Sequence, residues 1–349
     1  MASASERKRF HAGQQAAATL GDVARLAGVS PATVSRVLNR PQTVRLGLRD
    51  SVQRAIAELG YVPHGAARAL ASRRSQTIGA VVPTLDNAIF ATCIDALQRR
   101  LDGAGYVLLL ASTEYDRARE RSEVAALLER GVDGVMLVGG DHDPAVYRLL
   151  AGKRVPFVNT WVYETASGRP CVGFDNRRAA MRMTDYLLDL GHRRFAVIAG
   201  VTLHNDRAAE RVLGVQAALA ARGIALTPAQ IIERPYALAE GRDALRLLMR
   251  QKEPPTAIIC GNDVLAIGAL LECLAANIAV PGEISIAGFD DLELASHIQP
   301  GLTTLRVPSA GMGRRAAEYL VSRLDGRTVP DCVELDVELI VRGTTAPPP

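Results

Sequence analysis

Polar and aromatic side chains recur in loops that directly follow short apolar runs. "PTLDNAIFA" follows "IGAVV", "VTLHNDRAAER" comes after "FAVIAG", and "GND" and "GFDD" end two later runs. Carboxylates, amides and guanidinium groups form directed hydrogen bonds, and aromatic rings offer a flat apolar face. This chemistry suits a small polyhydroxylated or carboxylated molecule. The candidates are Asn87, Phe90, Asn205, Arg207, Arg211, Tyr236, Asn262, Asp263, Asp290 and Asp291. Each of them alone is also consistent with a helix cap or a surface charge.

A second polar set lies near the start of the chain, in "LGDVARLAGVSPATVSRVLN" at residues 20–39. Short hydroxyls, one guanidinium and one amide suit base edges and phosphates in a DNA major groove. The alternative is an ordinary helical hairpin with a polar outer face. The residues on the outward face of the second expected helix are Ala32, Thr33, Ser35, Arg36 and Asn39.

Cap and turn residues predict two short, closely joined helices in this stretch. Thr19 and Asp22 have the spacing of a capping box, and Gly28 tolerates the positive φ of a sharp turn. Ser30 can cap the second helix, and Pro31 suits its first position because a proline lacks only an N–H that would be unpaired there. The pattern is typical of a helix-turn-helix unit.

A third helix is expected to complete this small domain. Leu48, Val52, Ile56 and Leu59 form an apolar stripe at helical spacing, and Gly60 ends the pattern. Three short helices bury little apolar surface, so such a domain is marginally stable alone.

The segment that follows, "YVPHGAARALASRRSQ", indicates a hinge over residues 63–75. Two Ala-rich helical turns are marginal in water and are expected to order only on a surface. Leu70 is the one large apolar residue after the proline. It suits a wedge between minor-groove base steps, or it packs on the neighbouring domain as part of a linker.

From residue 76 onward, apolar runs alternate with amphipathic helical stretches, which is typical of parallel sheets covered by helices on both faces. The series restarts near Arg194, so we expect two doubly wound α/β lobes side by side. In such folds ligands bind beyond the carboxyl ends of the strands, here in the cleft between the lobes.

The charge is unevenly distributed along the 349 residues. Residues 1–75 hold 12 Lys and Arg against 4 Asp and Glu, whereas the remainder holds 29 against 33. A basic N-terminal part on a mildly acidic body indicates a polyanionic partner for that part alone. The sequence shows neither a secretory signal nor a membrane-spanning run. The five scattered cysteines indicate reduced thiols in a cytoplasmic protein.

Motifs of catalysis are weak or missing. "GMGRRA" at 311–316 matches G-x-G-x-x-A but lacks a preceding nucleotide-binding strand, so it is interpreted as a helix start. His192 in "LGHRR" is expected to satisfy a helix end. The six histidines show no metal spacing. We therefore expect no enzyme, no metal and no cofactor.

Nine stretches, in one order, resemble the lactose-repressor (LacI/GalR) family of bacterial transcription regulators over nearly the whole chain. They are "DVARLAGVSPATVSRVLN", "AIAELGYVPHGAARALAS", "IGAVVP", "VGFDN", "LGHRRFAVIAG", "NDRAAERVLG", "GNDVLAIGAL", "VPGEISIAGFDD" and "LTTLRVP". The resemblance implies an N-terminal all-α helix-turn-helix head with a hinge helix, and a body like the type I periplasmic binding proteins. It also implies a cytoplasmic homodimer, bound to a pseudo-palindromic operator and controlled by a small molecule.

The resemblance also assigns roles to individual residues. Bases would be read by Pro31, Ala32, Ser35 and Arg36, and the DNA backbone would be contacted by Thr19, Ser30 and Asn39, with Thr33 on the same face. Leu70 falls on the family's intercalating hinge leucine. The effector would be bound by Asn87, Ile89, Phe90, Arg207, Arg211, Tyr236, Asn262 and Asp290.

The resulting domain boundaries follow the changes in pattern. We expect a disordered arm at 1–18, the helix-turn-helix domain at 19–62, the hinge at 63–75 and the effector and dimerisation domain at 76–349. Lobe 1 would comprise about 76–174 and 302–332, and lobe 2 about 175–301 and 333–349. His64 and Gly65 depart from the family's hinge pattern, and the ending "VRGTTAPPP" lacks the leucine heptads of a tetramer.

The effector class stays open between three alternatives. "DNAIF", "VGFDN" and "AGFD" look closest to the gluconate-repressor branch, which implies a sugar acid whose carboxylate pairs with Arg207 or Arg211. A neutral sugar or a purine is the alternative. The rival function is a sugar-binding solute receptor with no DNA role, which would share the two lobes but not the basic head.

Overall fold

A computed structural model describes residues 18–62 and 74–349. The chain divides into two compact units, Met1–Ser75 and Gln76–Pro349. Most of the expected N-terminal arm and most of the hinge, Leu70 included, lie outside the described residues.

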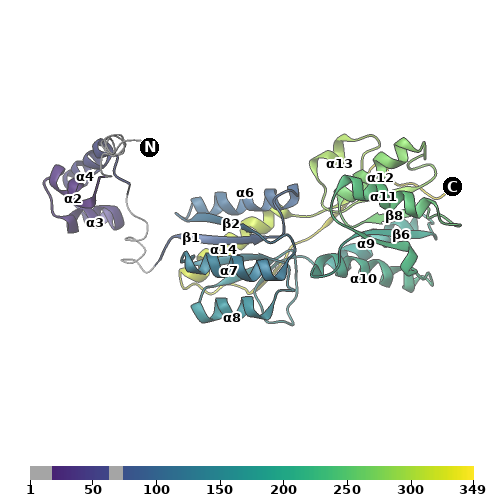
Figure 1. The fold of residues 1–349 in the computed structure, drawn as a ribbon, viewed down its shortest axis with the longest axis horizontal. Coiled ribbons are helices and arrows are strands. Elements are labelled where there is room, and N and C mark those ends of the chain that lie inside the picture. Colours follow the sequence, from purple (N-terminus) through teal and green to yellow (C-terminus); the bar gives the residue numbers. More distant parts are fainter. Residues whose placement is uncertain (1–17, 63–73) are drawn as a thin grey trace, which may run out of the picture. The chain divides into compact units, whose positions relative to one another are not determined.

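The first unit is all-α. Its helices are α2 (Leu20–Leu26), α3 (Pro31–Asn39) and α4 (Leu46–Leu59), with a 3-10 turn at Pro41–Thr43 (Figure 1). The expected caps are confirmed. Thr19 and Asp22 form a capping box, Ser30 caps α3 with Pro31 in the first turn, and Gly28 and Gly60 have φ of 66° and 58°.

A small apolar core joins these three helices. Val23 and Ala24 of α2 pack with Val34 and Val37 of α3 and with Val52 and Ala55 of α4. The expectation that Leu48 belongs to this stripe is wrong, because α4 begins at Leu46 and its first turn lies outside the core, which leaves Leu48 42% exposed. Ala55 is buried instead, one turn after Val52.

Lobe 1 of the second unit is built on a six-stranded sheet in the order β11-β5-β4-β3-β1-β2. All its strand pairs are parallel. The strands are β1 (Thr77–Val82), β2 (Val107–Ser112), β3 (Gly134–Val138), β4 (Phe157–Thr160), β5 (Cys171–Gly173) and β11 (Cys332–Glu334).

Four helices cover the two faces of this sheet. Apolar side chains of α6 (Ala88–Asp102) and α14 (Ser309–Leu324) fill the core on one face. Those of α7 (Arg117–Glu129) and α8 (Pro144–Lys153) fill a separate cluster on the other. "GMGRRA" lies inside α14, as expected for a helix start.

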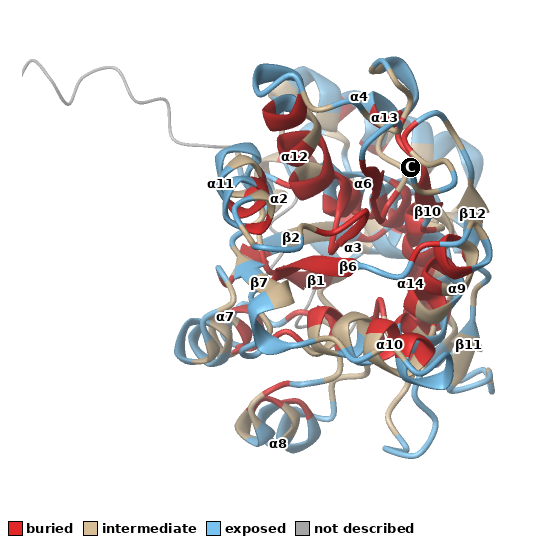
Figure 2. Cartoon of the chain, turned by 90° about the vertical axis from the view of Figure 1, so that its right-hand side faces the viewer, coloured by how far each residue is buried: buried red, intermediate tan, exposed pale blue. Residues whose placement is uncertain are grey.

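Lobe 2 repeats this plan around a parallel sheet in the order β7-β6-β8-β9. The strands are β6 (Phe195–Gly200), β7 (Ile231–Arg234), β8 (Ala257–Cys260) and β9 (Ser285–Ala287). The helices are α9 (Asn176–Asp189), α10 (Asp206–Ala221), α11 (Leu238–Met249), α12 (Asp263–Ala275) and α13 (Glu293–His297), with a 3-10 turn at Pro228–Gln230. In Figure 2, β1 and β6 are red because they are buried, and the outer faces of the surrounding helices are pale blue because they are exposed.

The chain crosses between the lobes three times. An antiparallel pair, β10 (Thr304–Arg306) with β12 (Glu338–Ile340), lies along two of these crossings. Because β11 pairs with β5, the lobe 1 sheet extends to Glu334, slightly beyond the expected boundary at 332. Sequence patterning missed this ribbon because its two strands have only three residues each.

Strand order fixes where a ligand site can form. It reverses between β1 and β3 in lobe 1 and between β6 and β8 in lobe 2. At such a reversal the chain leaves neighbouring strands toward opposite faces, which opens a crevice at their carboxyl ends. The loops after these strands carry the polar residues singled out above.

Candidate functional site

The outer face of α3 presents the residues expected to contact DNA. Pro31, Ala32, Arg36 and Asn39 are exposed, whereas Val34 and Val37 face the core. Arg36 makes no hydrogen bond or ion pair within residues 18–62, so its guanidinium is free for a base or a phosphate.

Hydrogen bonds order the other polar residues of this unit. Ser30 Oγ accepts from Thr33 N at 3.2 Å, and Asn39 Nδ2 donates to Ser35 Oγ at 3.2 Å. Thr19 Oγ1 accepts from Asp22 N at 3.2 Å and donates to Asp22 Oδ2 at 2.6 Å. Thr19 and Ser30 are therefore held by the bonds that cap α2 and α3, whereas the Asn39–Ser35 bond lies within α3.

In the second unit, all eight residues expected to bind the effector line one pocket between the lobes. Asn87, Ile89 and Phe90 come from lobe 1, and Asn205, Arg207, Arg211, Tyr236, Asn262 and Asp290 come from lobe 2, where Asn205 was a further candidate. The cavity has a volume of about 20 Å³, room for roughly one water molecule. The pocket is thus nearly closed, and a sugar-sized ligand requires the lobes or side chains to move.

Three of the asparagines cap helices as well as lining this pocket. Asn87, Asn205 and Asn262 accept from backbone N–H groups at the starts of α6, α10 and α12. The cap bond of Asn262 uses Oδ1, and its Nδ2 is buried without a partner among the described residues. An unpaired buried donor costs about 1–3 kcal/mol, which a ligand oxygen would relieve.

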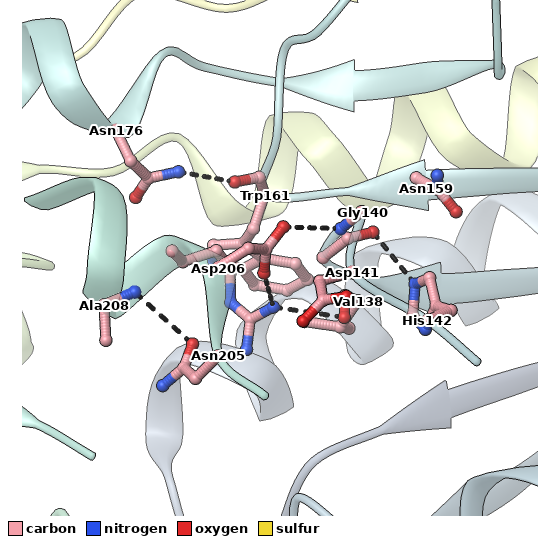
Figure 3. A network of polar contacts seen from close by, with 12 residues as sticks. Val138, Gly140, Asp141, His142, Asn159, Trp161, Asn176, Asn205, Asp206 and Ala208 are labelled. Carbon is pink, nitrogen blue, oxygen red and sulfur yellow. Dashed lines mark hydrogen bonds and ion pairs between the residues drawn. The ribbon is translucent and has the colours of Figure 1, made fainter. Parts of the chain in front are cut away.

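Arg211 is held on three sides. Its guanidinium lies 3.6 Å from the centre of the Phe289 ring, while Nε donates to Asn176 Oδ1 at 2.9 Å and Nη1 to Gly261 O at 2.7 Å. Asn176 Nδ2 in turn donates to Trp161 O at 2.8 Å, which links α9 to the end of β4 (Figure 3). Burial lowers the pKa of Arg211, and Asp290 opposes this shift.

The two adjacent aspartates have different environments. Burial raises the pKa of Asp290 to about 7, against a lowering by Arg211. Asp291 instead pairs with Arg306 at 2.7 Å and with Arg342 at 2.7 Å, on the crossing segments. Asp263 does not line the pocket; it accepts from Thr304 Oγ1 and Leu292 N, and burial raises its pKa to about 8.

Two residues from α10 hold the lobes together beside this pocket. Asp206 Oδ2 accepts from Gly140 N at 2.7 Å, and Arg207 Nη1 donates to Val138 O at 3.2 Å and to Asp206 Oδ1 at 2.9 Å (Figure 3). We call Val138, Gly140, Asp206 and Arg207 the clasp. Arg207 lines the pocket, but its Nη1 is already bound to lobe 1.

Residues 18–62 and 74–349 hold no cluster of His, Cys, Asp and Glu suited to a metal ion. Within the same ranges, no helix has the length and apolar character needed to cross a bilayer. His192 satisfies the end of α9 as expected, because its backbone N–H donates to Leu187 O at 3.3 Å. Its ring also hydrogen-bonds Thr256, just before β8, and Ser285, the first residue of β9.

Comparison with known proteins gives two family matches. Residues 19–64 match the model "Bacterial regulatory proteins, lacI family", and residues 184–345 match "Periplasmic binding protein-like domain". The HTH-type transcriptional regulator GntR of Pseudomonas aeruginosa is 36% identical over 330 residues, covering 94% of this chain and 95% of that protein. The chain belongs to the lacI family of bacterial regulatory proteins.

Two solved structures are similar over almost the whole chain. The lac repressor dimer bound to operator and the anti-inducer ONPF has a TM-score of 0.85 and 28% identity, covering 95% of this chain and 100% of that one. The transcriptional regulator CelR in complex with cellobiose has a TM-score of 0.69 and 30% identity, covering 94% and 99%. A helix-turn-helix unit followed by a two-lobed α/β body is thus the arrangement of this lacI-family chain.

The pocket of this lacI-family protein also contains two aromatic residues that sequence reasoning missed. Trp161 packs edge-on against Phe90 with ring centres 5.1 Å apart, and Tyr115 lies 6.4 Å from Tyr236 across the cleft. Trp161 directly follows β4, so the rule of searching behind each strand would have found it. Tyr115 lies three residues after β2, and no sequence pattern marks it as a pocket residue.

Ligand affinity is expected to rise with pH because of Asp290. A hydroxyl that donates to this carboxyl favours its ionised form. With a pKa of about 7, a ligand that needs the ionised form should bind about tenfold more tightly at pH 8 than at pH 6. Calorimetric titration at both values should show this slope in the native chain and a flat profile in Asp290→Asn. An equal slope in the variant would assign the effect to another group.

Stability of the ligand-free protein should move in the opposite direction. The folded-state pKa of Asp290 lies above its usual 3.8, so folding takes up a proton. This contribution is complete below about pH 3.8 and is lost as the pH rises through about 7.

Replacing Gly139 by Ala is expected to open the clasp. Gly139 has φ of +97°, and a Cβ there would lie 2.1 Å from Arg207 Nη1. We expect a loss of about 1–3 kcal/mol in unfolding free energy, measured by denaturant titration. Gly131→Ala is the control, because its φ is +75° but nothing lies within 4 Å of the added Cβ. Equal losses in both variants would show that backbone strain alone acts and that the clasp is unaffected.

Proposed function

We propose that this protein is a sequence-specific transcriptional repressor whose affinity for operator DNA is controlled by a small sugar or sugar acid. One observation carries the proposal: the chain joins a helix-turn-helix unit with a free polar face to a separate two-lobed body that encloses a polar pocket. The unpaired Asn262 Nδ2 and the buried, charged Arg211 and Asp290 are features of a ligand site.

On DNA, two copies would place two α3 helices in successive major grooves of a pseudo-palindromic operator. The bases would be contacted by Pro31, Ala32, Ser35 and Arg36. The DNA backbone would be contacted or flanked by Thr19, Ser30, Thr33 and Asn39. Leu70 would insert at the operator centre. Leu70→Ala, and a chain lacking residues 63–75, should each lose operator affinity; unchanged affinity would reject the hinge part of the proposal.

Exposed apolar side chains support a homodimer. Val107 and Leu110 are 61% and 44% exposed on β2, the edge strand of the lobe 1 sheet. Leu274 on α12 is 76% exposed. Apolar side chains exposed at a sheet edge are stabilised when another surface covers them. The similar lac repressor was solved as a dimer.

The pocket chemistry favours an effector with several hydroxyl groups. Asn262 offers a donor, Asp290 an acceptor, and Tyr236 and Trp161 offer ring faces. A carboxylate on the ligand would pair with Arg211, so a gluconate-like sugar acid is the favoured class. A neutral sugar or a purine is the alternative, and the cellobiose bound to the similar CelR shows a sugar in one relative.

Control would act through the angle between the lobes. The clasp and the Arg211–Asn176–Trp161 chain connect lobe 2 to lobe 1. A ligand that binds the open and closed arrangements with different affinities shifts their balance by that difference. Because lobe 1 continues directly into the hinge, its position would set whether two hinges can pair on DNA in the cytoplasm.

The second candidate function is a sugar-binding receptor with no role on DNA. The pocket alone is compatible with it. The net positive charge of residues 1–75 and the exposed Arg36 favour the regulator.

A ligand panel tests the proposal. The melting temperature of the full chain is measured with sugars, sugar acids, sugar phosphates and purines, beside Asp290→Ala. A ligand at about 100 times its dissociation constant adds about 2.7 kcal/mol, a rise of several degrees. We expect a sugar acid to give this rise in the native chain and not in the variant. A rise that persists in Asp290→Ala would place the ligand elsewhere.

A further inference from the structure

A second and much larger cavity lies beside the clasp, and Asp290 is not among its lining residues. Its volume is about 540 Å³, within the usual range for small-molecule sites, against about 20 Å³ for the effector pocket. We define the side pocket by Asn159, Tyr163 and Arg169 of lobe 1 and Asp175, Arg177 and Glu210 of lobe 2. We propose that the side pocket binds a small hydroxycarboxylate, separately from the effector.

The charges around the side pocket are unequally satisfied. Four of its carboxylates already have partners: Asp141 with Arg117, Glu164 with Ser167 N, Asp175 with Arg178 N, and Asp206 with the clasp. By contrast, Arg169 and Arg177 form no ion pair with any residue in 18–62 or 74–349. Arg169 also helps to lower the pKa of the nearby Glu164 carboxyl. The groups left to hydrogen-bond a ligand are the guanidinium N–H groups of Arg169 and Arg177 and the carboxylate of Glu210.

Arg169 is oriented in advance for an anion. Its guanidinium carbon lies 3.9 Å from the centre of the Tyr147 ring, which fixes the plane of the fork and removes water from one face. A flat, fixed guanidinium matches the two oxygens of a carboxylate with little further loss of entropy. Arg177, at the start of α9, supplies a second cation on the opposite lobe.

Asn159 adds a requirement for a hydrogen-bond donor on the ligand. Only 3% of the surface of Asn159 is exposed. Its Nδ2 donates to Tyr147 Oη at 3.2 Å. Its Oδ1 has no partner among the described residues, although Asn159 lines the side pocket beside Gly140 (Figure 3). A ligand hydroxyl would satisfy this acceptor, and Glu210 would accept a second.

A ligand in the side pocket would affect the opening and closing of the two lobes, which the clasp also restrains. Asn159 and Arg169 belong to lobe 1, whereas Arg177 and Glu210 belong to lobe 2. A hydroxycarboxylate held from both sides favours the closed arrangement already maintained by Asp206 and Gly140. The side pocket would therefore make the affinity for the first effector depend on a second metabolite, by the reciprocity of linked binding.

Calorimetric titration of the full-length Asp290→Ala chain tests this inference, because the effector pocket is impaired in that background. The probes are citrate and gluconate, with glucose as the neutral control. We expect one binding event per chain for a hydroxycarboxylate and none for glucose. Arg169→Gln and Arg177→Gln, each added to this background, should weaken binding at least tenfold, whereas Arg148→Gln on exposed α8 should leave it unchanged.

The possible results separate the two sites. Binding to the native chain that disappears in Asp290→Ala would support the effector pocket and reject the side pocket. The side-pocket proposal would also be rejected if a hydroxycarboxylate bound Asp290→Ala with the same affinity after Arg169→Gln or Arg177→Gln was added. Equal affinity for glucose and the hydroxycarboxylate would reject it as well. The folding check for each Arg variant is a melting temperature equal to that of the Asp290→Ala chain in which it is made.

Discussion

Arg36→Ala is expected to weaken operator binding by about 5- to 150-fold for each recognition helix. The side chain is exposed at the middle of α3, has no partner among residues 18–62, and lies on the same face as Ala32, Ser35 and Asn39. A guanidinium that reads a base edge is worth about 1–3 kcal/mol. The loss is measured as the dissociation constant on a selected operator, by fluorescence anisotropy at one fixed salt concentration.

Sequence dependence distinguishes base reading from simple charge attraction. If Arg36 reads a base, Arg36→Ala should lose more affinity on the operator than on random DNA, and its discrimination should fall at one position of each half-site. Lys252→Ala removes the same charge from an exposed place in the second unit and should change neither value. Equal losses on both DNAs would assign Arg36 to a phosphate contact.

Arg211→Lys is expected to weaken effector binding by about 10- to 150-fold while the chain stays folded. The substitution keeps the positive charge but removes the flat fork that lies on Phe289 and donates to Asn176 and Gly261 at once. Charged hydrogen bonds of this kind are worth about 1.5–3 kcal/mol. Calorimetric titration with the ligand identified by the melting panel gives the ratio.

A matched substitution on the same helix provides the control. Arg222 caps the end of α10 and pairs with Asp189 in solvent, so Arg222→Lys should leave ligand affinity unchanged. Near-native affinity in Arg211→Lys would mean that charge alone suffices. The ligand would then be held mainly by Asn262 and Asp290.

Local rules predicted the first unit almost completely. Thr19, Ser30, Gly28 and Gly60 lie at caps and turns whose conformations depend on nearest neighbours, and all four have the expected role. Leu48 was mispredicted because helical spacing does not say where the neighbouring helix ends, and the first turn of α4 extends beyond the core.

The effector pocket was predictable as a set of residues but not as a shape. Polar residues behind strands converge because parallel strands end at one edge, which explains why Asn87, Asn205 and Asn262 line the same cavity. Their second role as helix caps follows from the same local sequence. The near closure of the pocket depends on contacts between lobes, which no periodicity reveals.

The clasp could not be predicted from the sequence either, because it depends on contacts between the lobes. Arg207 was a candidate from the sequence and Asp206 was not, and their partners are the carbonyl of Val138 and the backbone N–H of Gly140. Backbone groups have no residue type, so the sequence carries no signal for them. Gly139 and its positive φ are intelligible only once Arg207 is seen beside it.

One measurement tests the central claim most directly: anisotropy of the full-length chain on DNA chosen by in vitro selection, titrated with and without the ligand found by the melting panel. We predict that selection returns a pseudo-palindromic sequence bound by two chains. Addition of the ligand should change its affinity by about 5- to 150-fold, and Arg211→Lys should abolish this change. Failure to enrich any sequence, or an affinity that the bound ligand leaves unaltered, would contradict the account.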